Sequence, residues 1–496
     1  MLVEMLFLSV VFLSGATLLL ATGLRGFGVL PLGYLAGLFT WVLVGVAFAL
    51  TGLPTAPPVL ISVLALISLV VFFGFRPMAL CRSRDYALIA AGVLTLLLMV
   101  WTLWQVGHVK YHIDTFRYLL VSGLLAENRF DLMNANLLTK RMLGAPLLHL
   151  PASMYESSHV VALTPLVGLS ILGGMGWFLW RIRPEGLSKG ALAVIIVLVV
   201  LLLATNNRFI WNSFYVNAHL FFGSAFMVLV AGLWLYVYQR AKGEGQFLLV
   251  LSCLAIPSLI VSRPEGFIAA ALAILPFVLS RGIGKTERSI VALVYLLSTL
   301  VWFGYVAWAL AGMGRDVPLA VLGPVLLSVI GILVLPLLWL DRWMQWRVTL
   351  LRAVEVALWI MLGLLSIRNT EIMTDSIAAT WENLVLGAGS WGASVLLLLA
   401  ILAYVFWALR RHVPIELRFP VTAMVPVFFL LAHLRGAAYR VGNGDSLNRM
   451  LIEVVPLAVL LVGIAMVMYW TAPQVSTGSE NLADGGNDKE KGVCAN

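Results

Sequence analysis

Charge is scarce in this chain of 496 residues, because Asp, Glu, Lys and Arg together make up only 11% of it. A soluble globular domain carries about 25% charged residues. Hydrophobic residues make up 61% of the chain, and the mean hydropathy is +1.00. Apolar runs of about 20 residues, long enough to cross a ~30 Å hydrocarbon core, recur along nearly the whole length. The composition excludes a soluble protein and predicts an all-α polytopic membrane protein.

Cysteine is scarce, with three residues in the chain, and nucleotide-binding motifs are lacking. Cys81, Cys253 and Cys494 have no metal-ligand spacing, and their expected places (cytosolic loop, membrane span and cytosolic tail) argue against a disulfide framework. The absence of a Gly-rich P-loop gives no support to ATP-driven transport or to a cytosolic nucleotide-sugar reaction. The net charge of +9 is attributed to basic residues that flank membrane spans rather than to nucleic-acid binding.

Fifteen membrane spans are expected, within a range of 12 to 15. Their approximate bounds are 3–22, 30–51, 58–75, 86–106, 160–180, 190–205, 217–239, 247–262, 267–280, 290–311, 318–340, 352–367, 386–408, 418–434 and 450–470. With the N-terminus outside, most of the 32 basic residues fall inside, and every short inside loop carries at least one. The outer face then holds the only long loop, 107–159, in which we expect amphipathic helices beside the membrane. Shorter outer segments follow at 206–216, 263–266, 312–317, 368–385 and 435–449.

The two ends of the chain differ in character. The N-terminus carries Glu4 instead of a basic region, which predicts a retained first helix rather than a cleaved signal peptide. The segment after Trp470 is rich in Gly, Asn, Asp and Lys, which predicts disorder. We therefore expect N-terminal extra spans over 1–85, a transmembrane core over 86–470 and a disordered cytosolic tail over 471–496.

The tetrapeptide Arg-Pro-Glu-Gly occurs twice, at 183–186 and at 263–266. Pro and Glu both suit the first turn of a helix, so the motif has a structural explanation. The copy at Arg183 falls in a basic inside loop, where its arginine marks topology. The copy at Arg263 fills the outer hairpin between two short spans, where charges are costly and are usually paired or functional. Arg263 and Glu265 are therefore candidates for the site.

The long outer loop opens with "GHVKYHIDTFRYLLVSGLLAENRFDL", in which Asp114 lies close to the fourth span. The residues after it form an amphipathic pattern, with an apolar stripe that suits a helix along the membrane interface. The stripe consists of Phe116, Leu119, Leu120, Gly123 and Leu124. Asp114 then stands in the first turn, where a carboxylate can act as a helix cap or serve chemistry.

The stretch Asp114-Thr-Phe-Arg-Tyr118 resembles a motif of GT-C class membrane glycosyltransferases, such as aminoarabinose transferases and protein O-mannosyltransferases. These enzymes place an acidic residue just outside an early span, often within Asp-Glu-x-x-Tyr. Thr115 replaces the second acid here, so no metal ligand is assigned, and a divalent metal is possible but not indicated. The resemblance implies that Asp114 is a general base, with Tyr118 in the substrate site.

The same resemblance implies a polyprenyl-phosphate sugar donor, whose leaving phosphate needs cations. The last outer segment, "HLRGAAYRVGNGDSLNRMLIEVVPL", supplies Arg435, Arg440 and Arg449, and resembles the late loop of such transferases. Arg449 is the first choice as phosphate ligand and Arg440 the second, with Arg263 and Arg435 as further candidates. Arg449 and Glu453 are four residues apart, so a snorkelling arginine paired with that glutamate is the structural alternative.

Other polar residues of the outer face are candidates for sugar contacts. Asp445 can bind substrate or cap the last span, and Asn217 can bind hydroxyl groups. His219 lies at the outer end of the seventh span, where a histidine is either a hydrogen-bonded structural residue or a ligand. Trp211 and Tyr215 fit an aromatic belt at the membrane interface.

Three classes of function are compatible with these features. The favoured one is a glycosyltransferase that moves a sugar from a polyprenyl-phosphate donor to a hydroxyl of a glycan, lipid or protein acceptor. An O-antigen polymerase or ligase, which relies on Arg and His, is the alternative, and a lipid-linked-sugar flippase or transporter is the third. Charge is almost absent from the middle of the spans, which favours chemistry at one surface. A bacterial inner membrane with the site facing the periplasm is the expected location.

Overall fold

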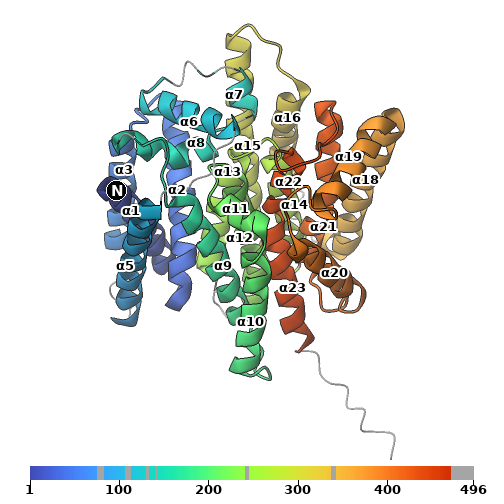
Figure 1. Ribbon diagram of the computed structural model, residues 1–496, viewed down its shortest axis with the longest axis horizontal. Coiled ribbons are helices and arrows are strands. Elements are labelled where there is room, and N and C mark those ends of the chain that lie inside the picture. The colour runs from blue at the N-terminus through green and yellow to red at the C-terminus, as the bar shows by residue number, and fades with distance from the viewer. Residues whose placement is uncertain are drawn as a thin grey trace, which may run out of the picture.

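The computed structural model describes residues 1–74, 83–106, 113–129, 133, 135–140, 142–155, 157–240, 245–336 and 342–470. Every regular element within these ranges is a helix, which confirms the all-α prediction (Figure 1). The predicted disordered tail and two of the cysteines, Cys81 and Cys494, lie outside the described residues.

Nine of the described helices are long and apolar enough to cross a membrane, or up to eleven if each of two bent helix pairs counts as one span. The nine are α1 (Leu2–Ala21), α2 (Val29–Thr51), α3 (Pro57–Gly74), α5 (Ser83–Val106), α9 (Leu163–Arg181), α12 (His219–Gln239), α15 (Lys285–Gly312), α18 (Arg347–Arg368) and α21 (Ile415–Arg435). The protein is therefore an integral membrane protein by the length and composition of its helices.

The two bent pairs change direction sharply. Helix α10 (Lys189–Ala204) meets α11 (Asn207–Ser213) at 73°, and α22 (Ser446–Met450) with the 3₁₀ turn η6 (Leu451–Glu453) meets α23 (Val455–Tyr469) at 41°. Asn206 caps α11 by accepting a hydrogen bond from the Phe209 amide at 3.1 Å. Both breaks lie toward the predicted outer ends of their spans.

Each of the fifteen predicted spans overlaps a helix, but four of the helices outside the two bent pairs are short. They are α13 (Gln246–Ile260), α14 (Gly266–Val278), α16 (Leu319–Val334) and α20 (Ala393–Trp407), and they have 13 to 16 residues. At 1.5 Å per residue such helices reach about 20–24 Å, which is less than the ~30 Å of a hydrocarbon core. The structure therefore supports nine to eleven spans among the described residues and does not confirm fifteen.

Further helices lie in segments that were predicted to be outer ones. The long loop forms α6 (Ile113–Ala126), α7 (Ala135–Lys140), α8 (Gly144–His149) and the 3₁₀ helix η3 (Leu150–Tyr155), and the segment before α20 forms α19 (Thr370–Leu384). A short helix, α17 (Arg342–Gln345), precedes α18. Helices α6, α7 and α8 gather at the same end of the molecule, at the top of Figure 1.

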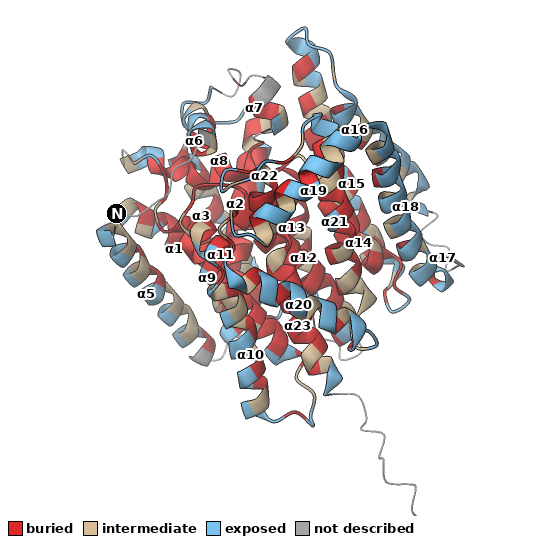
Figure 2. Cartoon of the chain, turned by 45° about the vertical axis from the view of Figure 1, so that its right-hand side comes forward, coloured by how far each residue is buried: buried red, intermediate tan, exposed pale blue. Residues whose placement is uncertain are grey.

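Helix α12 lies at the centre of the helix bundle. Of its most apolar stretch 94% is buried, compared with 11% for α5 and α18, which lie at the rim (Figure 2). Apolar side chains at the rim, such as Leu94 on α5 and Leu364 on α18, are exposed and suit contact with lipid tails. One continuous apolar core joins α1 and α2 to the C-terminal α23.

Helices α1 and α2 cross at very short range because glycines face each other. A Cβ atom on Gly15 would lie 2.0 Å from the Gly33 carbonyl oxygen, and one on Gly37 would lie 1.9 Å from the Val11 carbonyl oxygen. Small residues allow such close backbone contact between membrane helices. Any larger residue at either glycine would force the two helices apart.

Glu4 is a fully buried anchor rather than a surface charge. Its Oε2 atom accepts hydrogen bonds from the Trp104 indole and the Tyr155 hydroxyl, both at 3.0 Å. Its Oε1 atom accepts one from the Ala162 amide at 2.7 Å. The carboxylate therefore ties α1 to α5, to η3 and to the start of α9, which satisfies the requirement that buried polar atoms be hydrogen-bonded.

The two Arg-Pro-Glu-Gly copies lie near opposite ends of α12. Near its end, Gln239 accepts a hydrogen bond from Arg181, which is two residues before Arg183. Near its start, His219 bonds Glu453, which also contacts Arg263. A helix of 21 residues separates the two ends by about 30 Å. This arrangement agrees with the prediction that the copies face different sides of the membrane.

Labelling of single cysteines tests which side each end faces. In a background without the three natural cysteines, Asn443→Cys should react with a membrane-impermeant maleimide in intact cells. Glu185→Cys should react only after permeabilisation, because it lies in the loop between α9 and α10. Both positions are exposed, so access is set by the membrane. Labelling of both variants under the same condition would contradict the topology.

Candidate functional site

The centre of the site is an ion pair between Asp114 and Arg449, which are 335 residues apart in the sequence. Arg449 Nη1 lies 2.5 Å from Asp114 Oδ2, and the two side chains are 10% and 13% exposed. Asp114 is in the first turn of α6, and Arg449 is in the last turn of α22. A charge-assisted hydrogen bond of this length is a strong one. The structure thus brings together the predicted base and the first-choice phosphate ligand.

Helix α6 is held in place by the residues that follow Asp114. Thr115 is fully buried, and its hydroxyl donates to the Val216 carbonyl at 3.1 Å. Thr115, at the position of the second acid in the resembling motif, therefore fixes the helix to the segment before α12. Tyr118, one turn later, is also buried. The predicted apolar stripe is on the other side, where Phe116 and Leu120 are more than half exposed.

Tyr215 lies beside the ion pair, in the segment between α11 and α12. Its hydroxyl is 3.5 Å from Arg449 Nη1. Burial raises the pKa of Tyr215 to about 12; the Arg449 charge opposes this shift and the Asp114 charge adds to it. The phenol is therefore protonated at neutral pH and can donate a hydrogen bond. Tyr215 belongs to this site, although the sequence suggested an aromatic belt.

A second group of buried charges surrounds Glu453. Arg263 contacts Glu265 at 2.8 Å and Glu453 at 3.6 Å, and His219 Nδ1 lies 2.7 Å from Glu453 Oε1. All four side chains are at least nine-tenths buried. Coulomb interactions connect Tyr118 to Arg263 in this group and to Tyr215 in the first. The two groups are therefore electrostatically joined.

The structural alternative, in which Arg449 pairs with Glu453, is not what the structure shows, because Arg449 contacts Asp114. The four-residue spacing assumed one continuous helix, but α22 ends at Met450 and η6 turns the chain before Glu453. Glu453 points instead to His219 and Arg263. Gly223, one turn after His219 on α12, makes this approach possible, because a Cβ atom there would lie 2.7 Å from the Ile452 carbonyl oxygen.

The hairpin that carries Arg263 is also fixed to the long outer loop. The amides of Leu143 and Gly144 both donate to the Val261 carbonyl, at 3.1 and 2.9 Å. A Cβ atom on Gly144 would lie 2.5 Å from the Ser262 hydroxyl oxygen. Four predicted outer segments therefore meet at one end of the bundle. They are 107–159, 206–216, 263–266 and 435–449.

Asp445 and Asn217 are occupied by local hydrogen bonds. The Asp445 carboxylate accepts from the amides of Arg440, Leu447 and Asn448, and therefore caps α22. The Asn217 amide group donates to Asn212 Oδ1, and its carbonyl accepts from the His219 amide. These bonds position the backbone around the ion pair.

Arg435 and Arg440 lie at the rim of the site and are exposed. Arg435 donates to the Ser446 hydroxyl at 3.0 Å. Arg440 is held through its backbone, because its carbonyl accepts a hydrogen bond from the Asn383 side chain of α19 at 2.9 Å. Arg449, in contrast, donates a hydrogen bond directly to Asp114.

Arg208 is a buried cation that sequence reasoning missed. It is 1% exposed, donates to the Asn443 carbonyl at 2.6 Å and stands 4.9 Å from the centre of the Trp211 ring. Arg449 is near enough for the two positive charges to repel each other. In the sequence it is the one arginine of the outer stretch Asn206–Asn217, which is otherwise rich in amide and aromatic side chains.

Among the residues that the structure describes, no group of three or more His, Cys, Asp or Glu side chains could hold a metal ion. The polar side chains described above are arginines, carboxylates, a phenol and a histidine. No family model, no curated protein and no solved structure matches the chain. The resemblance to GT-C enzymes rests on the residues of the sequence alone.

Two histidines of the outer loop are buried close together. The rings of His149 and His159 have their centres 6.3 Å apart. Burial, with a smaller contribution from His159, lowers the pKa of His149 to about 3, and burial lowers that of His159 to about 4. Protonation of His149 would also break the 3.2 Å bond in which its Nδ1 atom accepts from the Val160 amide.

We expect the protein to lose stability as the pH falls from about 6.5 toward 4. The two histidines are neutral in the folded state, but they take up protons near pH 6.5 once unfolded, so their contribution is complete only above that pH. Each should cost about 1.4 kcal/mol per pH unit over this interval. The measurement is the unfolding midpoint in detergent as a function of pH. His149→Asn, which keeps an acceptor for Val160 but cannot be protonated, should flatten the curve, and an unchanged slope would contradict the assignment.

Proposed function

We propose that the protein is a glycosyltransferase that moves a sugar from a polyprenyl-phosphate donor to an acceptor hydroxyl at the outer surface of a bacterial cytoplasmic membrane. The observation that carries the proposal is the contact between Asp114 and Arg449 at the end of the bundle where the predicted outer segments meet. The proposed base for the acceptor hydroxyl and the proposed cation for the leaving phosphate are therefore in direct contact.

The reaction assigns a separate role to each partner of the pair. As the acceptor oxygen bonds to the anomeric carbon, its proton passes to the Asp114 carboxylate. The bond between that carbon and the phosphate oxygen breaks, and its electron pair stays on the phosphate. Asp114 becomes neutral at the moment when the phosphate gains negative charge, so the Arg449 charge is released to stabilise the leaving group.

The other charged residues fit this assignment at a distance from the reacting atoms. Tyr215 can donate to a phosphate or sugar oxygen, since its hydroxyl is protonated and faces Arg449. Arg435 and Arg440 add positive potential at the rim. Arg263 is bound to Glu265 and Glu453, so in this proposal it supports the site rather than holding the phosphate.

A second candidate is an O-antigen polymerase or ligase-type enzyme, in which Arg and His take the place of an Asp base. The buried contact that links His219, Glu453 and Arg263 favours it. Both candidates use a lipid-linked glycan, so they differ chiefly in their dependence on Asp114.

Asp114→Asn separates the two candidates. The amide keeps the shape of the side chain but cannot take the acceptor proton, so sugar transfer should fall by about 10² to 10⁴-fold. The assay is transfer from a panel of polyprenyl-phosphate sugars by the purified protein. Asp316→Asn, which changes an exposed carboxylate on a predicted outer segment, is the matched control and should retain activity. Full activity of folded Asp114→Asn would eliminate the general-base role.

Arg449→Ala tests the role of the arginine. Loss of a charge-assisted bond of about 1.5–3 kcal/mol should raise the donor concentration needed for half-maximal rate roughly ten- to hundredfold. Arg449→Lys should restore part of this loss, because it keeps the charge but not the planar fork. Arg368→Ala, an exposed arginine at the end of α18, serves as the control. Unchanged donor dependence in Arg449→Ala would count against phosphate binding.

A further inference from the structure

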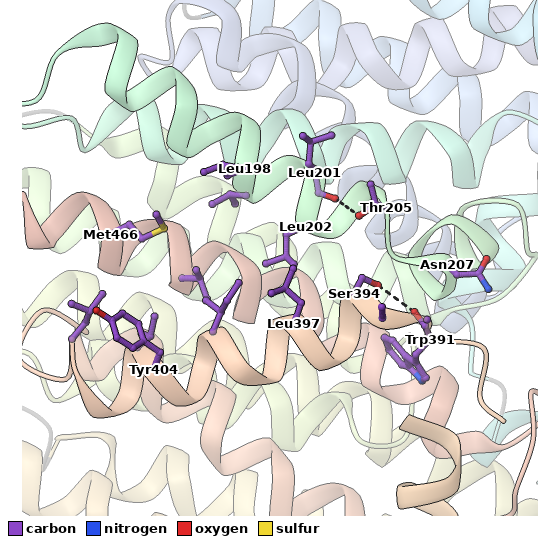
Figure 3. Close-up of a pocket in the computed structure, with 17 residues that line it drawn as sticks. Leu198, Leu201, Leu202, Thr205, Asn207, Trp391, Ser394, Leu397, Tyr404 and Met466 are labelled. Carbon is purple, nitrogen blue, oxygen red and sulfur yellow. Dashed lines mark hydrogen bonds between the residues drawn. The ribbon is translucent and has the colours of Figure 1, made fainter. Parts of the chain in front are cut away.

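A groove runs along the side of the bundle next to the site. Its cavity volume is about 750 Å³, and its walls come from α10, α20 and α23 (Figure 3). Leu198 and Leu202 of α10, Leu397 of α20 and Met466 of α23 give it an apolar lining. Leu397 is 54% exposed, so the groove is open toward the surroundings of the bundle. A long hydrocarbon chain suits such a lining.

The polar end of the groove adjoins the site. Asn207, Trp391 and Ser394 lie together at one end in Figure 3, away from Tyr404 and Met466. Hydrogen bonds link this end to its neighbours: Asn206 donates to Ser394, and Trp391 donates to Asn448 at 3.1 Å.

The site cations follow residues of this end, or their partners, in the chain. Asn207, which lines the groove, directly precedes Arg208, and Asn448, the partner of Trp391, directly precedes Arg449. The polar end of the groove therefore lies one residue along the chain from Arg208 and one hydrogen-bonded residue from the neighbour of Arg449.

Arg208 lacks an anionic partner although it is buried. No carboxylate lies within ion-pair distance of it among the described residues, and its Nε atom has no hydrogen-bond partner there. The Asp445 carboxylate acts on it electrostatically but is engaged by three backbone amides. A buried arginine that also faces the charge of Arg449 is unfavourable until an anion arrives.

We propose that the groove and Arg208 together bind a polyprenyl phosphate, with the isoprenoid chain between α10, α20 and α23 and the phosphate on Arg208. The inference rests on the proposed function, and it adds the place of the lipid and a cation that the sequence did not suggest. Arg208 is a substrate-binding residue in this assignment, and Arg449 reaches the same phosphate from the side of Asp114.

A single-chain lipid phosphate fits these features better than a two-chain phospholipid does. One groove offers room for one chain along three helices. A terminal phosphate monoester carries a charge of about −1.5 to −2 at pH 7, which two guanidinium groups can balance. The phosphodiester of a phospholipid carries a single negative charge. Arg208 thus matches the charge that the lipid phosphate holds after the sugar has left.

The test is binding of a labelled polyprenyl phosphate to the full-length protein in detergent micelles. We expect saturable binding that unlabelled polyprenyl phosphate displaces. The corresponding polyprenol, phosphatidylglycerol and inorganic phosphate should each compete at least tenfold less well. Equal competition by phosphatidylglycerol would identify an ordinary phospholipid site, and equal competition by inorganic phosphate a free-anion site. Either result would overturn the proposal.

Paired variants separate the two parts of the site. Arg208→Gln should weaken polyprenyl phosphate binding about ten- to hundredfold and remove the preference over polyprenol. Arg208→Lys should keep part of that preference. Leu397→Trp fills the groove, so it should weaken the binding of polyprenyl phosphate and of polyprenol alike. This variant tests the groove even if the Arg208 variants fail to fold. Arg183→Gln and Leu326→Trp, an exposed position on α16, are the matched controls.

The outcomes distinguish this inference from the proposed function. If sugar transfer is found but Arg208→Gln and Leu397→Trp bind polyprenyl phosphate like the unchanged protein, the inference fails and the function stands. If the lipid binds as expected but no polyprenyl-phosphate sugar is a donor, the function fails and the lipid site stands.

Discussion

The site depends on the pairing of charges in a part of the molecule that excludes water. Asp114 and Arg449 lie within hydrogen-bond distance, and both are mostly buried. Removal of one partner would leave the other as an unpaired buried charge, which is strongly destabilising. The same constraint explains the second group, in which Glu453 is shared by His219 and Arg263. Arg208 is the exception, because this buried cation has no carboxylate within ion-pair distance among the described residues.

The backbone around these charges is held by features that carry no charge. The Thr115 hydroxyl fixes the start of α6 to the segment before α12, and two amides of the outer loop share the Val261 carbonyl. Gly223 allows η6 to approach α12 closely. Caps at Asn206 and Asp445 set the starts of α11 and α22 beyond the breaks in their spans. The precise placement of a few arginines and carboxylates thus depends on many ordinary hydrogen bonds.

Much of the helical architecture and part of the site could be predicted from the sequence. Long apolar runs identify membrane helices, and in so apolar a chain a charged residue at an outer end stands out, as Asp114, Arg263 and Arg449 did. The number of spans could not be predicted, because hydropathy does not separate a short buried helix such as α14 from a full crossing. The alternative pairing of Glu453 with Arg449 does not form, because the four-residue spacing assumes a straight helix and the chain turns at η6. Arg208 was missed because its significance lies in what surrounds it after folding.

The ion pair at the centre joins the first quarter of the chain to its last membrane helix. Asp114, Tyr215, Arg263 and Arg449 come from four segments, and the arginine that completes the set precedes α23. The segment just before α23 supplies Arg449 to Asp114 and Glu453 to His219 and Arg263. Assembly of both charge groups therefore depends on the packing of this segment against parts of the chain that lie up to 335 residues earlier.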